Sequence, residues 1–295
     1  MAYTKAMKKN IKKILTLALS SILLLTACGS TSNTQSENKD NTQNSNKTAT
    51  LRKYKLGLNG TDHRVWENVR KRLNNDGIDL EFVEFADYIQ PNKALSSGDI
   101  DLNAFQTEIY FENFIKENNI DNLTPIGYTV VAPMGAYSKK VKDLKELPTD
   151  RALKVAIPND TSNGGRALKF LESLGYIKLD PSKGNLPTLL DIKENTKNLE
   201  ITEMAANQIP ASLPDLDFAI INNGVAYEAG LTISKDALAY EDYKEERMKD
   251  YWNIIAAKKD DAQKEDFKKI VEVYQTEETK KALEEQYGGQ SIPVW

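Results

Sequence analysis

Short apolar runs alternate with amphipathic stretches from Leu51 to the end of the chain. Runs rich in β-branched and aromatic residues predict strands at 54–59, 80–85, 102–105, 128–132, 153–157, 199–203, 218–222 and 252–256. Apolar residues spaced three and four apart predict helices at 64–74, 107–118, 162–174 and 262–275. Gly288 is expected to end a final helix. The alternation predicts an α/β architecture with a mostly parallel sheet, built either as one doubly wound sheet or as two smaller lobes.

The first 27 residues have the pattern of an export signal. Five lysines precede an uncharged run at 14–27, which is shorter than the roughly 20 apolar residues that span a membrane. The run ends in LTAC, which resembles the bacterial lipobox and implies cleavage before Cys28 and a diacylglyceryl thioether on its sulfur. Such a lipid anchor predicts attachment to the extracytoplasmic face of a bacterial cell membrane. The alternative is an ordinary signal peptide with a chance cysteine.

The segment that follows the cysteine is strongly polar. Residues 29–50 contain no aromatic residue and no aliphatic residue larger than Ala49. Such a composition cannot bury enough apolar surface to offset its chain entropy. We therefore expect residues 28–50 to be a lipidated cysteine followed by a flexible tether.

Composition excludes several classes of function. Without the five lysines near the N-terminus, 34 basic residues face 43 acidic ones, which disfavours a nucleic-acid binder. One Cys and one His exclude a disulfide framework, a Cys-rich zinc or iron–sulfur site and a multi-His metal site, so no metal or cofactor is expected, although an all-oxygen metal site stays open.

Motifs of catalysis are also missing from the sequence. There is no Gly-x-Ser-x-Gly elbow, phosphate-binding lysine loop or Rossmann glycine triplet. A Ser–His–Asp triad would depend on His63, the only histidine. Glu108 and Glu112 could form a carboxylate pair of the glycosidase type, but acidic residues this common usually lie on a solvated surface. The sequence therefore does not favour an enzyme. If the protein takes part in an energy-driven process, a partner must supply the energy.

One candidate binding feature follows the predicted strand at 153–157. Asp160 or Thr161 can cap the next helix, whose N-terminus is then a potential anion site. Arg166, one turn into this helix, carries a planar guanidinium suited to a carboxylate. The alternative is a capped helix whose arginine pairs with a neighbouring acid.

A second candidate feature combines aromatic and amide side chains. Tyr88 and Phe105 lie at the carboxyl ends of two predicted strands, where open α/β sheets bind ligands. There they could pack against an apolar or thioether side chain, or they could simply fill the core. Asn222, at the end of another strand, offers an amide to an ammonium or carboxylate group.

These pieces occur in blocks that resemble the MetQ/NlpA family of methionine-binding lipoproteins. The blocks are FVEFADY (82–88), QPNKAL (90–95), GDIDLNAFQ (98–106), YSKK (137–140), AIPND (156–160), GRAL (165–168), GYIKL (175–179), ENTKNL (194–199) and IINN (220–223), with the terminal Trp295. The resemblance implies a two-lobe periplasmic-binding-protein-like fold with the ligand in the cleft between the lobes. Lobe one would comprise 51–132 and 255–295, and lobe two 133–254.

The same resemblance implies roles for particular residues. Arg166 would hold the ligand carboxylate, and Asn222 would hold the amino-acid head group with help from Asn163. Tyr88 and Phe105 would wall the side-chain pocket. Gln106 would lie beside them, with Thr107 at the pocket edge.

Among the positions that depart from the family pattern, two bear on the edge of the expected pocket. Thr107 stands where members often carry His, and Val225 stands where many carry Tyr. Such changes alter the size and the hydrogen-bond donors of a pocket, and thereby the ligand that it prefers.

The family resemblance implies a membrane-anchored, non-catalytic lipoprotein that delivers L- or D-methionine to an ABC permease and its ATPase. One alternative keeps the fold but binds another amino acid or a methionine-containing dipeptide, which Thr107 and Val225 favour. A second alternative is a surface adhesin with a vestigial cleft.

Overall fold

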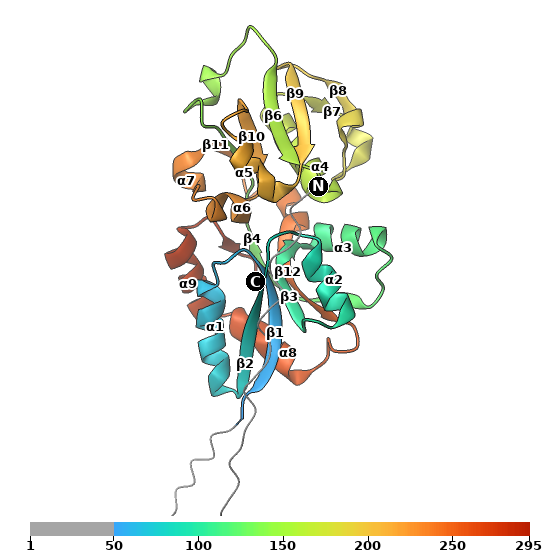
Figure 1. Ribbon diagram of the computed structural model, residues 1–295, viewed down its shortest axis with the longest axis vertical. Coiled ribbons are helices and arrows are strands. Elements are labelled where there is room, and N and C mark those ends of the chain that lie inside the picture. The colour runs from blue at the N-terminus through green and yellow to red at the C-terminus, as the bar shows by residue number, and fades with distance from the viewer. Residues whose placement is uncertain (1–49) are drawn as a thin grey trace, which may run out of the picture. The chain divides into compact units, whose positions relative to one another are not determined.

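The computed structural model describes residues 50–295, in which two β-sheets carry helices on their faces (Figure 1). The signal peptide predicted at 1–27, the lipidated Cys28 and the predicted tether up to residue 49 lie outside the described residues. Within residues 50–295, no helix is both long and apolar enough to cross a membrane.

The first sheet has six strands in the order β13-β4-β12-β3-β1-β2. Its strands are β1 (Arg52–Asn59), β2 (Ile78–Phe85), β3 (Leu102–Thr107), β4 (Leu123–Val131), β12 (Trp252–Lys258) and β13 (Ile292–Pro293). Its helices are α1 (Arg64–Asn75), α2 (Gln90–Ser97), α3 (Glu108–Glu117), α8 (Glu265–Tyr274) and α9 (Glu277–Tyr287). We call this sheet and its helices the first lobe.

The two faces of the first sheet are covered by different helices because neighbouring residues of a strand point to opposite sides. In β12, Ile255 and Ala257 pack with α1, α8 and α9. Ile254 and Ala256 of the same strand pack with α2 and α3. The sheet is therefore buried on both faces, which explains its continuous apolar runs.

The second sheet has five strands in the order β11-β5-β10-β6-β9. Its strands are β5 (Gly135–Tyr137), β6 (Leu153–Pro158), β9 (Leu199–Met204), β10 (Phe218–Ile221) and β11 (Ala237–Tyr240). Its helices are α4 (Thr161–Ser173), α5 (Ile209–Ser212), α6 (Asn223–Glu228) and α7 (Ile233–Asp236), and the hairpin of β7 (Lys178–Leu179) and β8 (Ile192–Glu194) lies beside α4. Short 3-10 turns occur at Leu144–Glu146, Pro181–Lys183, Leu189–Asp191, Ala206–Gln208 and Glu246–Tyr251.

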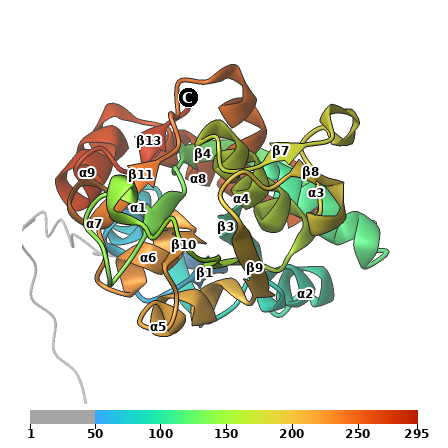
Figure 2. The ribbon, with the colours of Figure 1, turned by 90° about the horizontal axis from the view of Figure 1, so that it is seen from above.

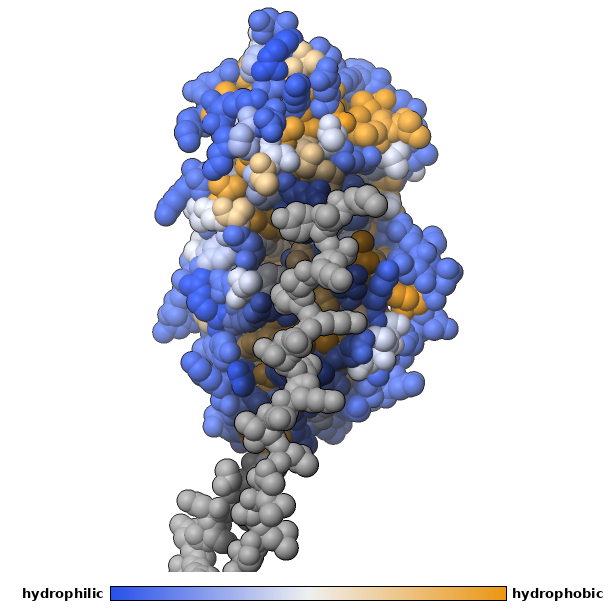
Figure 3. All heavy atoms as spheres, in the orientation of Figure 1, coloured by the Kyte–Doolittle hydropathy of each residue, from blue (hydrophilic) through white to orange (hydrophobic). Residues whose placement is uncertain are grey.

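This second lobe is also layered. Val155 and Ile157 of β6 pack with α4, whereas Ala156 between them packs with α5, α6 and α7. Figure 2 shows α4 on one side of the second sheet and α5, α6 and α7 on the other. On the face drawn in Figure 3, the described surface is mostly hydrophilic, with apolar side chains gathered in smaller groups. The apolar residues of both lobes therefore lie mainly in the helix–sheet layers.

The chain crosses between the two sheets twice. The first crossing segment, residues 132–134, leads from β4 to β5, and the second, residues 241–251, leads from β11 to β12. The α/β two-lobe fold expected from the resemblance is thus present, while the residue bounds predicted for the lobes remain a prediction.

All eight predicted strands and all four predicted helices are present, with ends shifted by a few residues. The final helix α9 ends at Gly288, whose φ of 55° is the left-handed conformation typical of such a cap. The expectation of a mostly parallel sheet is wrong, because both sheets are mixed. β12 returns from the second lobe and inserts between β3 and β4, running against both.

Candidate ligand-binding site

A cavity of ≈ 200 Å³ lies between the lobes and is lined by residues of both. The seven residues predicted to bind ligand all line it: Tyr88, Phe105, Gln106, Thr107, Asn163, Arg166 and Asn222. They converge because the carboxyl ends of strands from both sheets meet at the cleft. Tyr88 and Asn222 follow such strand ends, and Phe105, Gln106 and Thr107 form the end of β3. Asn163 and Arg166 lie in the first turns of α4, which follows β6. Whether each of them contacts a ligand stays a prediction.

One wall of the cavity is aromatic. The rings of Tyr88 and Phe105 are 6.0 Å apart, and Tyr110 of α3 lies 6.0 Å and 6.2 Å from them, edge-on to both. The Tyr110 hydroxyl donates to the Tyr88 carbonyl at 2.8 Å, which fixes the loop after β2 against α3. Burial raises the pKa of both tyrosine hydroxyls, so both stay neutral. Tyr110 lies inside a helix predicted from the sequence, but no motif marks it as a site residue.

Gln106 lines the cavity, but its amide is already engaged. Its Nε2 donates to Asn92 and Asn103 at 2.7 and 2.9 Å, and its Oε1 accepts from Asn92 at 2.7 Å. All three side chains are buried. Gln106 therefore ties α2 to β3, the strand that also carries Phe105.

Thr107 has a structural task as well. It is the N-cap of α3, and its hydroxyl accepts from the Tyr110 amide at 3.2 Å. Its side chain therefore contributes to the position of the aromatic wall. Val225 lies outside the main cavity and lines a second, smaller one of ≈ 90 Å³.

The N-terminus of α4 is capped by Asp160, whose carboxylate accepts from the Asn163 amide at 2.9 Å. The cap engages the Asn163 amide, and the anion site expected at this helix end stays a prediction. Burial raises the pKa of Asp160, although bonds from Asn163 and Ser162 favour its charged form.

Polar side chains continue from this cap toward the cavity. Asn163 donates its Nδ2 to Asp160 at 3.0 Å and accepts from Asn222 Nδ2 at 2.7 Å. The Asn222 Oδ1 is buried and has no hydrogen-bond partner within residues 50–295. Asn222 thus lines the cavity and carries a buried acceptor without a partner among these residues.

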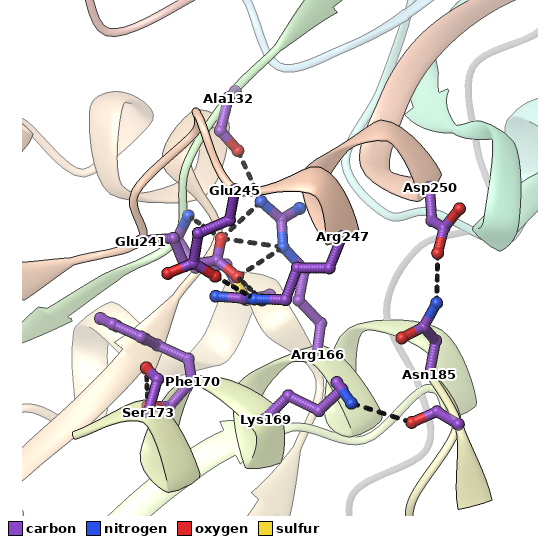
Figure 4. Close-up of polar contacts among 12 residues, drawn as sticks. Ala132, Arg166, Lys169, Phe170, Ser173, Asn185, Glu241, Glu245, Arg247 and Asp250 are labelled. Atoms are coloured by element: carbon purple, nitrogen blue, oxygen red, sulfur yellow. Dashed lines mark hydrogen bonds and ion pairs between the residues drawn. The ribbon is translucent and has the colours of Figure 1, made fainter. Parts of the chain in front are cut away.

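Arg166 pairs with a neighbour, as in the alternative left open by the sequence. Its Nε and Nη2 donate to the Glu241 carboxylate at 2.9 and 2.6 Å, and Nη2 also donates to the Ala132 carbonyl at 2.9 Å (Figure 4). Its side chain is only 3% exposed, and the Tyr251 ring centre lies 4.4 Å from its Cζ. A guanidinium has five N–H donors, and within residues 50–295 only those on Nε and Nη2 have partners, so the two on Nη1 remain for another group.

Glu241 is a site residue that the sequence did not indicate. It stands in an acidic stretch just after β11, 75 residues from Arg166 along the chain, and no motif marks it. Only the fold brings the two side chains together.

Hydrogen bonds between the lobes lie beside both cavities. The Glu228 carboxylate of α6 accepts from the amides of Thr61 and Asp62 at 3.0 and 3.2 Å. On another side, Asn207 donates to the Ala86 carbonyl at 3.0 Å. The structure therefore shows the protein in a conformation in which the two lobes are hydrogen-bonded to each other across the cleft.

Two α/β lobes, joined by two crossing segments and enclosing a cavity lined by both, define a two-lobed binding protein. Comparison with known proteins gives the family. The family model described as NlpA lipoprotein matches residues 55–295, and the chain belongs to this family.

Named relatives agree with this assignment. The chain is 42% identical over 239 residues to the D-methionine-binding lipoprotein MetQ of Yersinia pestis, covering 80% of this chain and 86% of that protein. It also resembles a nutrient binding protein from Burkholderia cenocepacia solved bound to methionine, with 40% identity, a TM-score of 0.76 and coverage of 82% and 100%.

A third comparison is the substrate binding protein of a methionine transporter from Streptococcus pneumoniae. It is 39% identical, with a TM-score of 0.76 and coverage of 82% of this chain and 96% of that one. These relatives are named for binding or transport, and the chain is a binding protein rather than an enzyme.

Proposed function

We propose that this lipoprotein captures methionine, L or D, and delivers it to an ABC permease. The observation that carries the proposal is the division of the cavity into an aromatic wall and a polar wall. Tyr88 and Phe105 lie on the first lobe, whereas Arg166 and Asn222 lie on the second. An amino acid with an apolar side chain presents these two kinds of surface.

Each end of methionine has a matching group. Its thioether would pack against the aromatic rings, a contact worth about 0.3–1.5 kcal/mol. Its carboxylate would accept from Arg166 Nη1, and its ammonium would donate to the open Oδ1 of Asn222. Because these groups belong to different lobes, the ligand would favour the conformation in which the lobes touch.

The partners follow from the anchor and from the class of protein. Lipid on Cys28 would hold the protein at the extracytoplasmic face of the membrane, beside the permease and its ATPase. The chain's sequence carries no nucleotide-binding motif, so the partner ATPase would supply the energy of transport. Loss of permease-dependent methionine uptake on deletion of this protein would support transport, and unchanged uptake would favour the adhesin alternative.

Calorimetry tests the ligand directly. Soluble protein beginning at Leu51 is unfolded and refolded to remove carried-over ligand, then titrated with L-methionine, D-methionine, methionine dipeptides and other amino acids. We expect saturable heat with methionine that Arg166→Ala loses. If only another amino acid binds, the protein is a binding protein for a different substrate. If no compound of the panel gives heat, the proposal is contradicted.

A second candidate is a longer ligand, such as a methionine-containing dipeptide. The second cavity shares Tyr88 and Tyr110 with the main one, and Ala86, Ala206 and Val225 make it largely apolar. A ligand that passes the Tyr88 ring would enter it. The dipeptides in the same titration decide between the two candidates.

A further inference from the structure

Glu241 lies at the junction of the two crossing segments. Its residue is 1% exposed, and its carboxylate accepts from the Met134 amide at 2.8 Å. Its own amide donates to the Met134 carbonyl at 3.0 Å. Backbone and side chain of Glu241 therefore both hold the second crossing segment against the first.

The same carboxylate holds Arg166. Nε and Nη2 of Arg166 form the two-pronged contact with Glu241, while the Ala132 carbonyl takes the second hydrogen of Nη2. Ala132 belongs to the first crossing segment and Glu241 to the second. The guanidinium is thus fastened to both segments (Figure 4).

The surroundings leave one side of the guanidinium open. The Tyr251 ring lies 4.4 Å from Cζ, and Tyr251 itself ends the second crossing segment. Arg247 donates to the other carboxylate oxygen of Glu241 at 3.2 Å, so two cations share this buried anion. Arg166 lines the cavity, and among the described residues only its Nε and Nη2 have hydrogen-bond partners, which leaves Nη1 without one.

We propose that Glu241 is a positioning residue that presents Arg166 Nη1 to the ligand carboxylate and couples this contact to the crossing segments. Two-lobed proteins close by bending at such segments. Because Glu241 and Ala132 hold Arg166 to both of them, the direction of Nη1 depends on how the segments are bent. The inference rests on the proposed function, in which the ligand carries a free carboxylate.

The test compares a ligand that has the carboxylate with one that lacks it. The full chain, purified in detergent, is titrated with L-methionine and with L-methioninamide. Glu241→Asp keeps the charge but shortens the side chain, so it cannot reach Arg166 and Met134 together. We expect about tenfold weaker L-methionine binding and less than about twofold change for the amide. Glu241→Gln is the second variant if Glu241→Asp does not fold.

Two controls separate positioning from general damage. Glu245→Asp alters the other carboxylate that Arg247 contacts, which does not touch Arg166, and it should leave both affinities unchanged. Arg166→Ala combined with Glu241→Asp should bind L-methionine no more weakly than Arg166→Ala alone. Equal losses for both ligands, or additive effects in the double variant, would overturn the inference.

Failure of the proposed function gives a different result. In that case the wild-type chain binds neither compound. Hydrogen exchange at the side-chain Nε–H of Arg166, followed by its NMR resonance, still tests whether Glu241 holds the Arg166 guanidinium in place. Slow hydrogen exchange in the wild type that becomes about tenfold faster in Glu241→Asp supports the role of Glu241. Unchanged exchange overturns it.

Discussion

Asn222 donates its Nδ2 hydrogen to Oδ1 of Asn163 at 2.7 Å, and this bond fixes which way the Asn222 amide points. Asn163 is itself oriented, because its own amide hydrogens go to Asp160. The Oδ1 of Asn222 is left as a buried acceptor without a partner within residues 50–295. An unmet acceptor costs about 1–3 kcal/mol, and a ligand ammonium would remove that cost.

Replacing Asn222 with Ala should weaken ligand binding, with a small net change in stability, because loss of the bond to Asn163 is offset by removal of the unmet Asn222 acceptor. A hydrogen bond to a charged group contributes about 1.5–3 kcal/mol, so we expect a loss of about 10- to 100-fold in affinity for methionine. Calorimetry gives the affinity and urea unfolding gives the stability. Asn68→Ala, on the exposed side of α1, is the control. Wild-type affinity in Asn222→Ala would contradict the assigned role.

Asp160 should affect both stability and binding through its cap. Asp160→Ala removes the acceptor of the Asn163 amide and should cost about 1 kcal/mol of unfolding free energy, with weaker ligand binding. Asp160→Asn keeps an N-capping oxygen and removes a buried carboxylate whose pKa burial raises, so it should be at least as stable as the wild type at pH 7. Equal destabilisation in both variants at pH 7 would rule out the cap as the cause.

Glu228 should stabilise the conformation in which the lobes touch. Its carboxylate accepts from the amides of Thr61 and Asp62 on the opposite lobe. We expect Glu228→Ala to raise the ligand dissociation rate about fivefold, because loss of these bonds makes the closed form about 1 kcal/mol less stable relative to the open form.

Stopped-flow fluorescence measures this rate, and small-angle scattering measures the fraction of open protein. The control is Glu285→Ala, which removes an exposed ion pair within the first lobe. If Glu228→Ala leaves both the rate and the scattering curve unchanged, these contacts do not stabilise the closed form.

Val225 should decide whether a longer ligand fits. It is 8% exposed and lines the second cavity beside Tyr88. Val225→Tyr would fill that space, so we expect binding of methionine dipeptides to be lost while methionine affinity changes less than about threefold. Val225→Ile fills the space only in part and should give an intermediate result. Unchanged dipeptide affinity in Val225→Tyr would show that this cavity is not used.

The positions of the candidate site residues were predictable because each depends on local sequence. Each of three residues lies at or just after the end of an apolar run: Tyr88, Phe105 and Asn222. These runs are strands whether the chain forms one sheet or two lobes, and the carboxyl ends of strands meet at the cleft. The cap at Asp160 was likewise visible from one short segment. Local patterns of this kind need no knowledge of distant contacts.

Strand direction and ion-pair partners were not predictable in the same way. The alternation of apolar residues in β12 is the same whether the strand runs parallel or antiparallel, so the mixed sheets could not be foreseen. The pairing of Arg166 with Glu241 depends on the second crossing segment, which carries no motif. The availability of a side chain for a ligand is therefore harder to predict than its place at the cleft.

Asp217 gives the second lobe a pH-dependent stability. Its side chain is 2% exposed, and its carboxylate accepts two hydrogen bonds from Arg151 at 2.7 Å and one from the Lys154 amide at 2.8 Å. The bonds from Arg151 are the main reason that its pKa falls to about 2, against an ordinary value of 3.8. Its folded-state pKa is depressed, so its contribution is complete above pH 4 and is lost as the pH falls toward 2.

Asp217→Asn should therefore lower the free energy of unfolding by about 2 kcal/mol at pH 7. The gap between the variant and the wild type should narrow steadily below pH 4, because the wild-type carboxyl becomes neutral as well. Urea unfolding followed by circular dichroism between pH 7 and pH 3 measures it. Asp215→Asn, an exposed position two residues earlier, should change stability little at any pH. A gap that stays constant down to pH 3 would mean that the charge of Asp217 is not the source of the stability.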